Sequence, residues 1–249
     1  MTTPYYQDEQ VTLYHGTIAD VLPTINAEID LIMADPPYAE TSLAWDRWPD
    51  GWPSLLDGYG ASMWCFGSMR MFLDRAAEFA GWKLSQDVVW QKNRRTTVAT
   101  DRFARIHEHA LHWYRGDWRS IHHTPPKVPR VGPSKGTAHR SATPPNINGA
   151  RGAVTWHDDG TRWQSTVINV ASVWRDRGLN ETEKPAGILR PLIQYGCPPR
   201  GTVLDLFAGS ASASLEARNL GMNSIAIEAR EAQCESAALR LSAGVLDLS

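Results

Sequence analysis

At residues 203–212 the chain has the sequence Val203-Leu204-Asp205-Leu206-Phe207-Ala208-Gly209-Ser210-Ala211-Ser212, and this stretch indicates the fold class. An apolar run containing one acid leads into small residues, and helical spacing then continues to Leu220. This order predicts a buried strand, a tight turn and a helix. Small residues let a ligand approach the free backbone N–H groups where the helix begins. A strand, turn and helix without a ligand would have a similar sequence, so the stretch alone leaves the ligand open.

A second acid, Glu228, stands at the end of the next apolar run. In a parallel sheet it would lie beside the turn after Asp205, where a carboxylate can accept both hydroxyls of a ribose. A stricter pattern would have a second Gly at position 211, where this chain has Ala211. The stretch is therefore not a dinucleotide fingerprint.

Outward from this stretch, apolar runs alternate with segments of helical spacing. The predicted strands are residues 11–15, 29–34, 61–66, 85–90, 109–114, 202–206 and 223–228. The predicted helices are residues 69–80, 185–196, 211–220 and 229–241. Such alternation predicts an α/β fold with a mainly parallel sheet and helices on both faces.

Residues 116–164 interrupt this pattern with six prolines among Gly, Ser, Thr, His and Arg. A segment with so few aliphatic residues cannot bury a core of its own, so we expect an irregular insertion. The chain then divides into residues 1–115, 116–164 and 165–249. The first and last of these ranges form two halves of one domain.

Positive charge is concentrated in the middle of the chain, although the net charge is only −2. Residues 91–151 hold twelve Lys or Arg against three Asp or Glu, and six of the eight histidines. Such a concentration is typical of a surface that follows nucleic-acid phosphates, and it makes Arg94, Arg95, Lys127 and Arg130 candidates for phosphate contacts. The alternative is a basic loop surrounded by solvent.

The remaining composition predicts a cytoplasmic protein. The longest apolar runs are too short to span a membrane. No secretory signal is visible at the N-terminus. Three cysteines lie far apart without a Cys-x-x-Cys pair, which fits a reducing compartment.

The sequence Asp35-Pro36-Pro37-Tyr38 follows directly on the predicted strand 29–34, at the end of a strand where α/β sheets bind ligands. Two prolines fix the backbone and remove two donors, which leaves rigid carbonyls exposed. The acid and the Pro36 carbonyl could accept the two hydrogens of an exocyclic amino group while the base stacks on Tyr38. The alternative is a Pro-Pro turn that only closes the strand.

With these motifs the chain resembles the beta-arrangement amino DNA methyltransferases, in which Asp-Pro-Pro-Tyr precedes the methyl-donor segment. Thr182-Glu183-Lys184-Pro185, Leu43-Ala44-Trp45-Asp46, Val89–Asn93 and Arg105–His109 resemble further segments of that family. The resemblance implies a Rossmann-like fold that binds S-adenosylmethionine. It assigns catalysis to Asp35, Pro36, Pro37 and Tyr38, DNA contact to Trp45, and donor binding to Asp205, Phe207, Gly209, Ser210, Glu228, Thr182, Lys184 and Pro185.

Three positions depart from the family pattern. Gly16-Thr17 stands where the family has Gly-Asp, so a donor contact by that Asp is missing or is taken over by Asp20. Asn180 replaces the His that commonly opens the Lys-Pro segment, and Ala211 replaces a glycine. None of the three lies in the catalytic tetrapeptide.

These observations predict site-specific methylation of adenine N6 in double-stranded DNA, with residues 116–164 recognising the target. Methylation of cytosine N4 is the nearest alternative, although family members that use cytosine more often carry Ser before the prolines. Motif order disfavours an RNA, protein or small-molecule methylase. A DNA-binding module without catalytic activity is a further alternative.

The candidate partners and ligands follow from the same resemblance. A homodimer remains open, because the family often forms dimers. A cognate restriction endonuclease also remains open, because the sequence does not show whether one exists. His107, His109 and His112 suggest a metal site, but no acidic cluster accompanies them, so we expect no metal.

Overall fold

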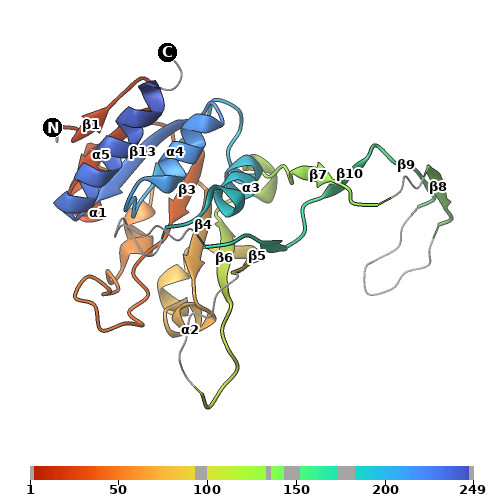
Figure 1. The fold of residues 1–249 in the computed structure, drawn as a ribbon, viewed down its shortest axis with the longest axis horizontal. Helices are drawn as coiled ribbons and strands as arrows, with labels where there is room; N and C mark the ends of the chain where they lie inside the picture. The colour runs from red at the N-terminus through yellow and green to blue at the C-terminus, as the bar shows by residue number, and fades with distance from the viewer. Residues whose placement is uncertain (1–2, 93–99, 133–135, 143–151, 173–182, 247–249) are drawn as a thin grey trace. The chain divides into compact units, whose positions relative to one another are not determined.

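The computed structural model describes residues 3–92, 100–132, 136–142, 152–172 and 183–246. Its main sheet has nine strands in the order β1-β2-β13-β12-β3-β4-β6-β5-β11 (Figure 1). These strands are β1 (Tyr6–Gln7), β2 (Val11–His15), β3 (Leu31–Ala34), β4 (Ser62–Gly67), β5 (Lys83–Gln91), β6 (His107–Tyr114), β11 (Val167–Asn169), β12 (Thr202–Asp205) and β13 (Asn223–Glu228). Strands β2, β13, β12, β3 and β4 run parallel, whereas β6 is antiparallel to both of its neighbours.

The helices are α1 (Ile18–Val21), α2 (Met69–Asp74), α3 (Ala186–Gly196), α4 (Ser212–Asn219) and α5 (Glu231–Leu246). Short 3-10 helices are formed by Leu22–Thr24, Trp52–Leu56, Ala76–Phe79 and Trp118–Ser120. No helix among the described residues is long and apolar enough to cross a membrane.

Alternate residues of the central strands serve two separate cores. Ile32 of β3 packs in one cluster with Phe72 of α2 and with the 3-10 helix Trp52–Leu56. Its neighbour Leu31 packs in a second cluster with residues of α3 and α4. Since successive strand residues point to opposite faces, the sheet is covered on both sides. The predicted α/β fold with a mainly parallel sheet is confirmed.

The predicted helix 69–80 differs in detail from the observed structure. Helix α2 ends at Asp74, and Arg75, with φ −110° and ψ 10°, leads into the 3-10 helix Ala76–Phe79. This change of direction carries Phe79 into the core, where it stacks on Trp113 with ring centroids 4.9 Å apart. Helical spacing alone does not reveal such a break.

The chain forms two compact units, one of residues 1–124 with 166–249 and the other of residues 125–165. The smaller unit contains two antiparallel pairs, β7 (Lys127–Pro129) with β10 (Thr161–Trp163) and β8 (Thr137–Arg140) with β9 (Val154–His157). These strands were not predicted, because they are only three or four residues long and carry no alternation of buried apolar side chains. The smaller unit is therefore built from short hairpin pairings.

Candidate active site

The carboxyl ends of four parallel strands meet at one cavity of about 850 Å³ in the larger unit. Asp35 follows β3, Asp205 ends β12, Glu228 ends β13 and Gly16 follows β2, and all four line the cavity. Neighbouring parallel strands place their carboxyl ends at the same edge of the sheet. Residues at the ends of these strands therefore lie close together. Ligand pockets typically have volumes of roughly 300–1,000 Å³.

The tetrapeptide after β3 lies at the wall of this cavity. The Tyr38 hydroxyl donates a hydrogen bond to Asp35 Oδ1 at 2.9 Å, and Lys184 Nζ lies 2.5 Å from Asp35 Oδ2. Both oxygens of Asp35 therefore have a fixed donor, which defines the plane of its carboxylate. Burial, together with the charges of Asp35 and Glu108, raises the pKa of Tyr38 well above its usual value, so its hydroxyl keeps the proton that it donates.

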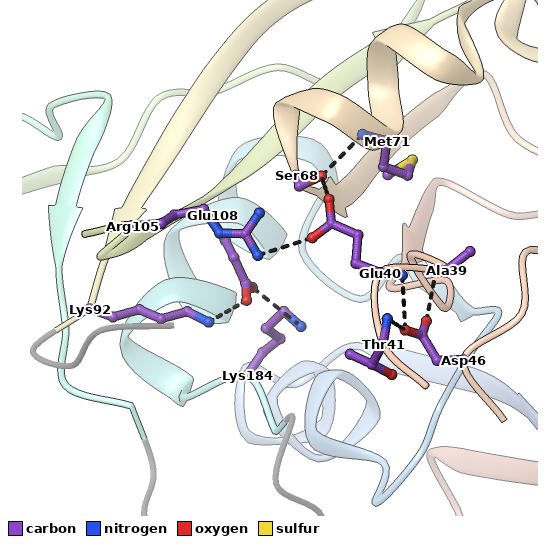
Figure 2. A network of polar contacts seen from close by, with 10 residues as sticks. All are labelled: Ala39, Glu40, Thr41, Asp46, Ser68, Met71, Lys92, Arg105, Glu108 and Lys184. Atoms are coloured by element: carbon purple, nitrogen blue, oxygen red, sulfur yellow. Dashed lines mark hydrogen bonds and ion pairs between the residues drawn. The ribbon is translucent and has the colours of Figure 1, made fainter. Parts of the chain in front are cut away.

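Asp46 fixes the backbone that continues from the tetrapeptide (Figure 2). Its carboxylate accepts hydrogen bonds from the backbone N–H groups of Ala39 at 2.8 Å, Glu40 at 3.0 Å and Thr41 at 2.7 Å. Ala39 has a left-handed φ of 56°, which turns these three groups toward one point. Burial opposes ionisation of Asp46, but the hydrogen bonds outweigh it and lower its pKa.

The loop between β12 and α4 curves around Glu228. The Gly209 N–H donates to Glu228 Oε2 at 2.7 Å, and the Arg230 N–H donates to Oε1 at 2.9 Å. Gly209 and Ala211 both have left-handed φ angles, 53° and 58°. The left-handed angle explains why the family pattern has a glycine where this chain has Ala211, since a Cβ costs free energy in that conformation.

Helix α5 holds the same loop from the other side through Arg240. Its guanidinium donates to the Ser210 hydroxyl at 3.2 Å and to the Ser212 hydroxyl at 3.1 Å, and it pairs with Glu183 at 2.7 Å. One side chain thus joins the β12–α4 loop to the segment that carries Lys184.

Asp205 lies fully inside the protein below this loop. Burial raises its pKa to about 7, although the Ser214 hydroxyl, which donates to it at 3.1 Å, acts in the opposite direction. The charges of Asp35 and Glu228 raise this pKa further. Three carboxyl groups therefore converge on the cavity, where Lys184 pairs with Asp35 at 2.5 Å and Arg230 pairs with Glu228 at 3.2 Å.

Most of the predicted site residues meet at this cavity. Its lining includes Asp35, Pro36, Pro37, Tyr38, Trp45, Lys184, Asp205, Phe207, Gly209, Ser210 and Glu228. Pro185 stands directly before α3, behind Lys184. Thr182, Arg94 and Arg95 fall outside the described residues.

Lys127 and Arg130, the other two predicted DNA contacts, belong to the smaller unit. Lys127 pairs with Asp159 at 2.6 Å, and the Arg130 guanidinium pairs with Asp158. The Arg130 side chain is only 13% exposed.

Thr17, which stands where the family pattern has Asp, has a role in the local structure. Thr17 caps α1 by accepting a hydrogen bond from the Asp20 N–H, and its hydroxyl donates to Asp20 Oδ2 at 2.6 Å. Thr17 lines the cavity. The Asp20 carboxylate therefore accepts a hydrogen bond from the hydroxyl that caps the helix.

Several charged side chains beside the tetrapeptide had no predicted role. Glu40 accepts hydrogen bonds from Ser68 and Arg105, and Glu108 contacts Lys92 (Figure 2). Glu108 and Lys92 lie in two of the segments that resemble the family, but the resemblance gave neither side chain a role, and Glu40 had no sequence signal of its own.

One histidine of β6, His112, makes contacts with the two neighbouring strands. His112 is buried and contacts the Ser62 hydroxyl at 3.0 Å and the Ser85 hydroxyl at 2.8 Å. Among the described residues, no group of three or more His, Cys, Asp or Glu side chains could hold a metal ion.

Comparison with known proteins assigns the family. The N6/N4 DNA methylase family matches residues 29–239. The chain belongs to this family. The Type II methyltransferase M2.LlaDCHI of Lactococcus lactis subsp. cremoris is 23% identical and covers 98% of this chain and 94% of its own length. M2.DpnII of Streptococcus pneumoniae is 22% identical over the same shares of both chains.

Solved structures show the same fold. A complex of M1.HpyAVI with S-adenosylmethionine has a TM-score of 0.62 and 21% identity, and covers 92% of this DNA methylase and 99% of that chain. The PvuII DNA methyltransferase, described as cytosine-N4-specific, has a TM-score of 0.65 and 13% identity, and covers 96% and 89%. The predicted family, the methyltransferase activity on DNA and the S-adenosylmethionine donor are confirmed.

Proposed function

We propose that this DNA methylase transfers the methyl group to N6 of adenine in double-stranded DNA. The observation that carries the proposal is that Asp35, Pro36 and Tyr38 share one cavity with Gly209, Ser210 and Glu228. An acceptor for an amino group and a loop suited to a nucleoside then face the same cavity.

The residues act by position and by charge. S-adenosylmethionine, when bound, supplies an electrophilic methyl group on sulfur. We assign its binding to Asp205, Phe207, Gly209, Ser210, Glu228, Thr182, Lys184 and Pro185. The target base must leave the duplex to enter the cavity. Asp35 and the Pro36 carbonyl then accept the two amino hydrogens, and Tyr38 supplies a stacking face with Pro37 fixing the turn.

The transfer itself needs no covalent enzyme intermediate. The amino nitrogen of the target base would attack the methyl group that the bound donor supplies, and Asp35, which accepts an amino hydrogen, would receive the surplus proton. Acceptors placed where positive charge develops stabilise that transition state.

The choice of adenine over cytosine depends on Asp35 in the position where cytosine enzymes of this family more often have Ser. Fold alone does not distinguish the two bases, because a cytosine-N4-specific enzyme shares it at a TM-score of 0.65. Methylation of cytosine N4 is the second candidate function.

The test is methyl transfer to duplex DNA at saturating donor, followed by digestion to nucleosides. Wild type should yield N6-methyladenine, and Asp35→Ala should lose transfer while it still binds donor and DNA. Recovery of N4-methylcytosine would exclude adenine but keep the enzyme class. Near wild-type turnover by Asp35→Ala would remove Asp35 from the mechanism.

Tyr38 gives an independent measure of base stacking in the same assay. Tyr38→Phe should keep substantial activity because the ring remains. Tyr38→Ala should lose about 1–3 kcal/mol of base interaction. Equal activity of the two variants would contradict a stacking role.

DNA contacts outside the cavity are proposed for Trp45, Arg94, Arg95, Lys127 and Arg130. Trp45 is 38% exposed at the cavity rim, where Arg230 lies over its ring at 5.1 Å. We also propose a cytoplasmic location, which is supported by three buried free cysteines.

A further inference from the structure

Four charged side chains of alternating sign form a line behind the tetrapeptide, which we call the ion chain: Lys92, Glu108, Lys184 and Asp35. Lys92 Nζ donates to Glu108 Oε1, and Glu108 Oε2 lies 3.6 Å from Lys184 Nζ (Figure 2). Lys184 Nζ in turn lies 2.5 Å from Asp35 Oδ2. The four residues come from four places in the sequence, after β5, on β6, before α3 and after β3.

Three of the four members of the ion chain have little access to water. The side chains of Lys92, Glu108 and Lys184 are 11%, 13% and 7% exposed. A buried charge is costly unless it is paired, so each of these ions depends on its neighbours. The rings of Phe66 and Tyr38 lie 5.2 Å and 5.8 Å from Lys184 Nζ and further confine it.

We infer that Glu108 is a positioning residue that holds the Lys184 ammonium against Asp35, so that the Asp35 carboxylate stays oriented to accept the amino hydrogen of the target base. This inference rests on the proposed function. Lys92 completes the arrangement by neutralising the second oxygen of Glu108. Lys184, assigned above to donor binding by resemblance, here contacts the catalytic acid.

The ion chain makes the charge of Lys184 depend on Glu108. The groups that face Lys184 are Asp35, Glu108, Lys92, Tyr38 and the Cys65 thiol of β4. Burial lowers the pKa of Lys184, but the two carboxylates outweigh burial and raise it above its usual value. Removing the charge of Glu108 leaves one carboxylate, so Lys184 should lose its proton at a lower pH.

The kinetic test is Glu108→Gln, which keeps the side-chain shape but removes the charge. With donor and DNA saturating, kcat at neutral pH should fall roughly tenfold. The alkaline limb of the kcat profile should move down by roughly one pH unit, the shift that a charged neighbour produces. The donor Kd at neutral pH should change less than about twofold, because the variant leaves the Lys184 side chain in place and still charged at that pH. An unmoved alkaline limb would overturn the inference.

Glu216→Gln is the matched control. Glu216 of α4 is also buried and pairs with a cation, Arg190 at 2.5 Å, but it lies outside the cavity lining. This variant should lose stability without moving the pH profile. If both variants moved the alkaline limb equally, Glu108 would have only a structural role.

A second measurement works on the protein without donor or DNA. The sequence has only five lysines, Lys83, Lys92, Lys127, Lys135 and Lys184, so carbon-13 labelled lysine allows each ammonium to be titrated by NMR. Lys184 should titrate at lower pH in Glu108→Gln than in wild type. An identical titration would overturn the ion chain. If wild type transfers no methyl group, the proposed function fails, and this titration still decides the inference about Lys184.

The double variant Glu108→Gln/Lys92→Met controls for misfolding of Glu108→Gln. In the single variant Lys92 loses its carboxylate partner, and the second substitution removes that buried cation. The double variant should recover the melting temperature of wild type but keep part of the shift in the alkaline limb. Because Lys92 is a cation near Lys184, its removal should move the limb part of the way back toward wild type. A limb that stays at the wild-type position in Glu108→Gln after its melting temperature is restored would overturn the inference.

Discussion

At the scale of single residues, Asp46 holds the backbone of the segment that follows the tetrapeptide. One buried carboxylate accepts three backbone N–H groups of the segment that follows Tyr38. Hydrogen bonds to an ionised acceptor contribute more than neutral ones, and removing the acceptor would break all three at once. Asp46 therefore fixes the direction in which the chain leaves the tetrapeptide.

Asp46→Ala should lower the unfolding free energy by about 2 kcal/mol. It should also lower kcat by roughly 10- to 100-fold, because the tetrapeptide would no longer be held in place. Asp8→Ala is the matched control, since Asp8 also accepts two backbone N–H groups, from Gln10 and Val11. Denaturant melts and kcat measurements should show destabilisation in both variants and loss of kcat in Asp46→Ala alone. An intact kcat in Asp46→Ala would separate this loop from catalysis.

At the scale of elements, strand β6 contains a buried histidine between its two neighbouring strands. Burial, with a smaller effect of His123, lowers the pKa of His112 from 6.5 to about 4. The folded protein therefore keeps His112 neutral where the unfolded chain would bind a proton. This contribution to stability is complete above pH 6.5 and is lost as the pH falls toward 4.

The pH effect of His112 should amount to about 3 kcal/mol between pH 6.5 and pH 4. Unfolding free energies from urea melts at several pH values would measure it. The replacement His112→Gln keeps hydrogen-bonding groups near Ser62 and Ser85 but does not titrate, so the difference between variant and wild type should change with pH. A constant difference across this range would contradict the assignment.

Helix α5 contributes Arg240 to the loop that we assign to donor binding. Arg240→Met removes its contacts to Ser210, Ser212 and Glu183 while it keeps an unbranched side chain. The donor Kd measured by calorimetry should rise about tenfold, which corresponds to 1.4 kcal/mol. Arg190→Met serves as the control, because Arg190 pairs with Glu216 away from the cavity. Equal donor affinity in both variants would remove Arg240 from this role.

The helices and strands also show how much of the fold and of the cavity could be predicted from the sequence. Strand and helix positions around Asp35, Asp205 and Glu228 follow from apolar periodicity, and these strand ends define the cavity. The pairings of Glu108 and Arg240 were not foreseeable, because each depends on side chains that meet only after the sheet has formed. The strands of residues 125–165 were missed for a related reason, since they have too few buried side chains to produce a periodic pattern.

At the scale of the whole molecule, charge is divided between regions. A net charge of −2 conceals a balance of +9 in residues 91–151. Part of this charge is compensated locally, because Lys127 pairs with Asp159 and Arg130 with the buried side chain of Asp158. Lys127 is the more exposed of the two cations, so it can exchange its acid for a phosphate at less cost.

Replacing Arg94, Arg95, Lys127 and Arg130 together by Ala should therefore weaken DNA binding and flatten its salt dependence. Each lost phosphate contact lowers the slope of log K against log salt by about 0.9, since fewer counterions are released. Donor affinity should stay unchanged. Of the single variants, Lys127→Ala should reduce the slope, whereas Arg130→Ala should mainly destabilise the smaller unit by leaving Asp158 without this cation.

Fluorescence anisotropy at several salt concentrations measures these slopes. Arg200→Ala is the control for charge, because Arg200 precedes β12 at the edge of the sheet opposite the cavity. Its slope should equal that of wild type. If the fourfold variant also kept the wild-type slope, the basic segment would face solvent rather than phosphate, and target recognition would have to be sought at the cavity rim around Trp45.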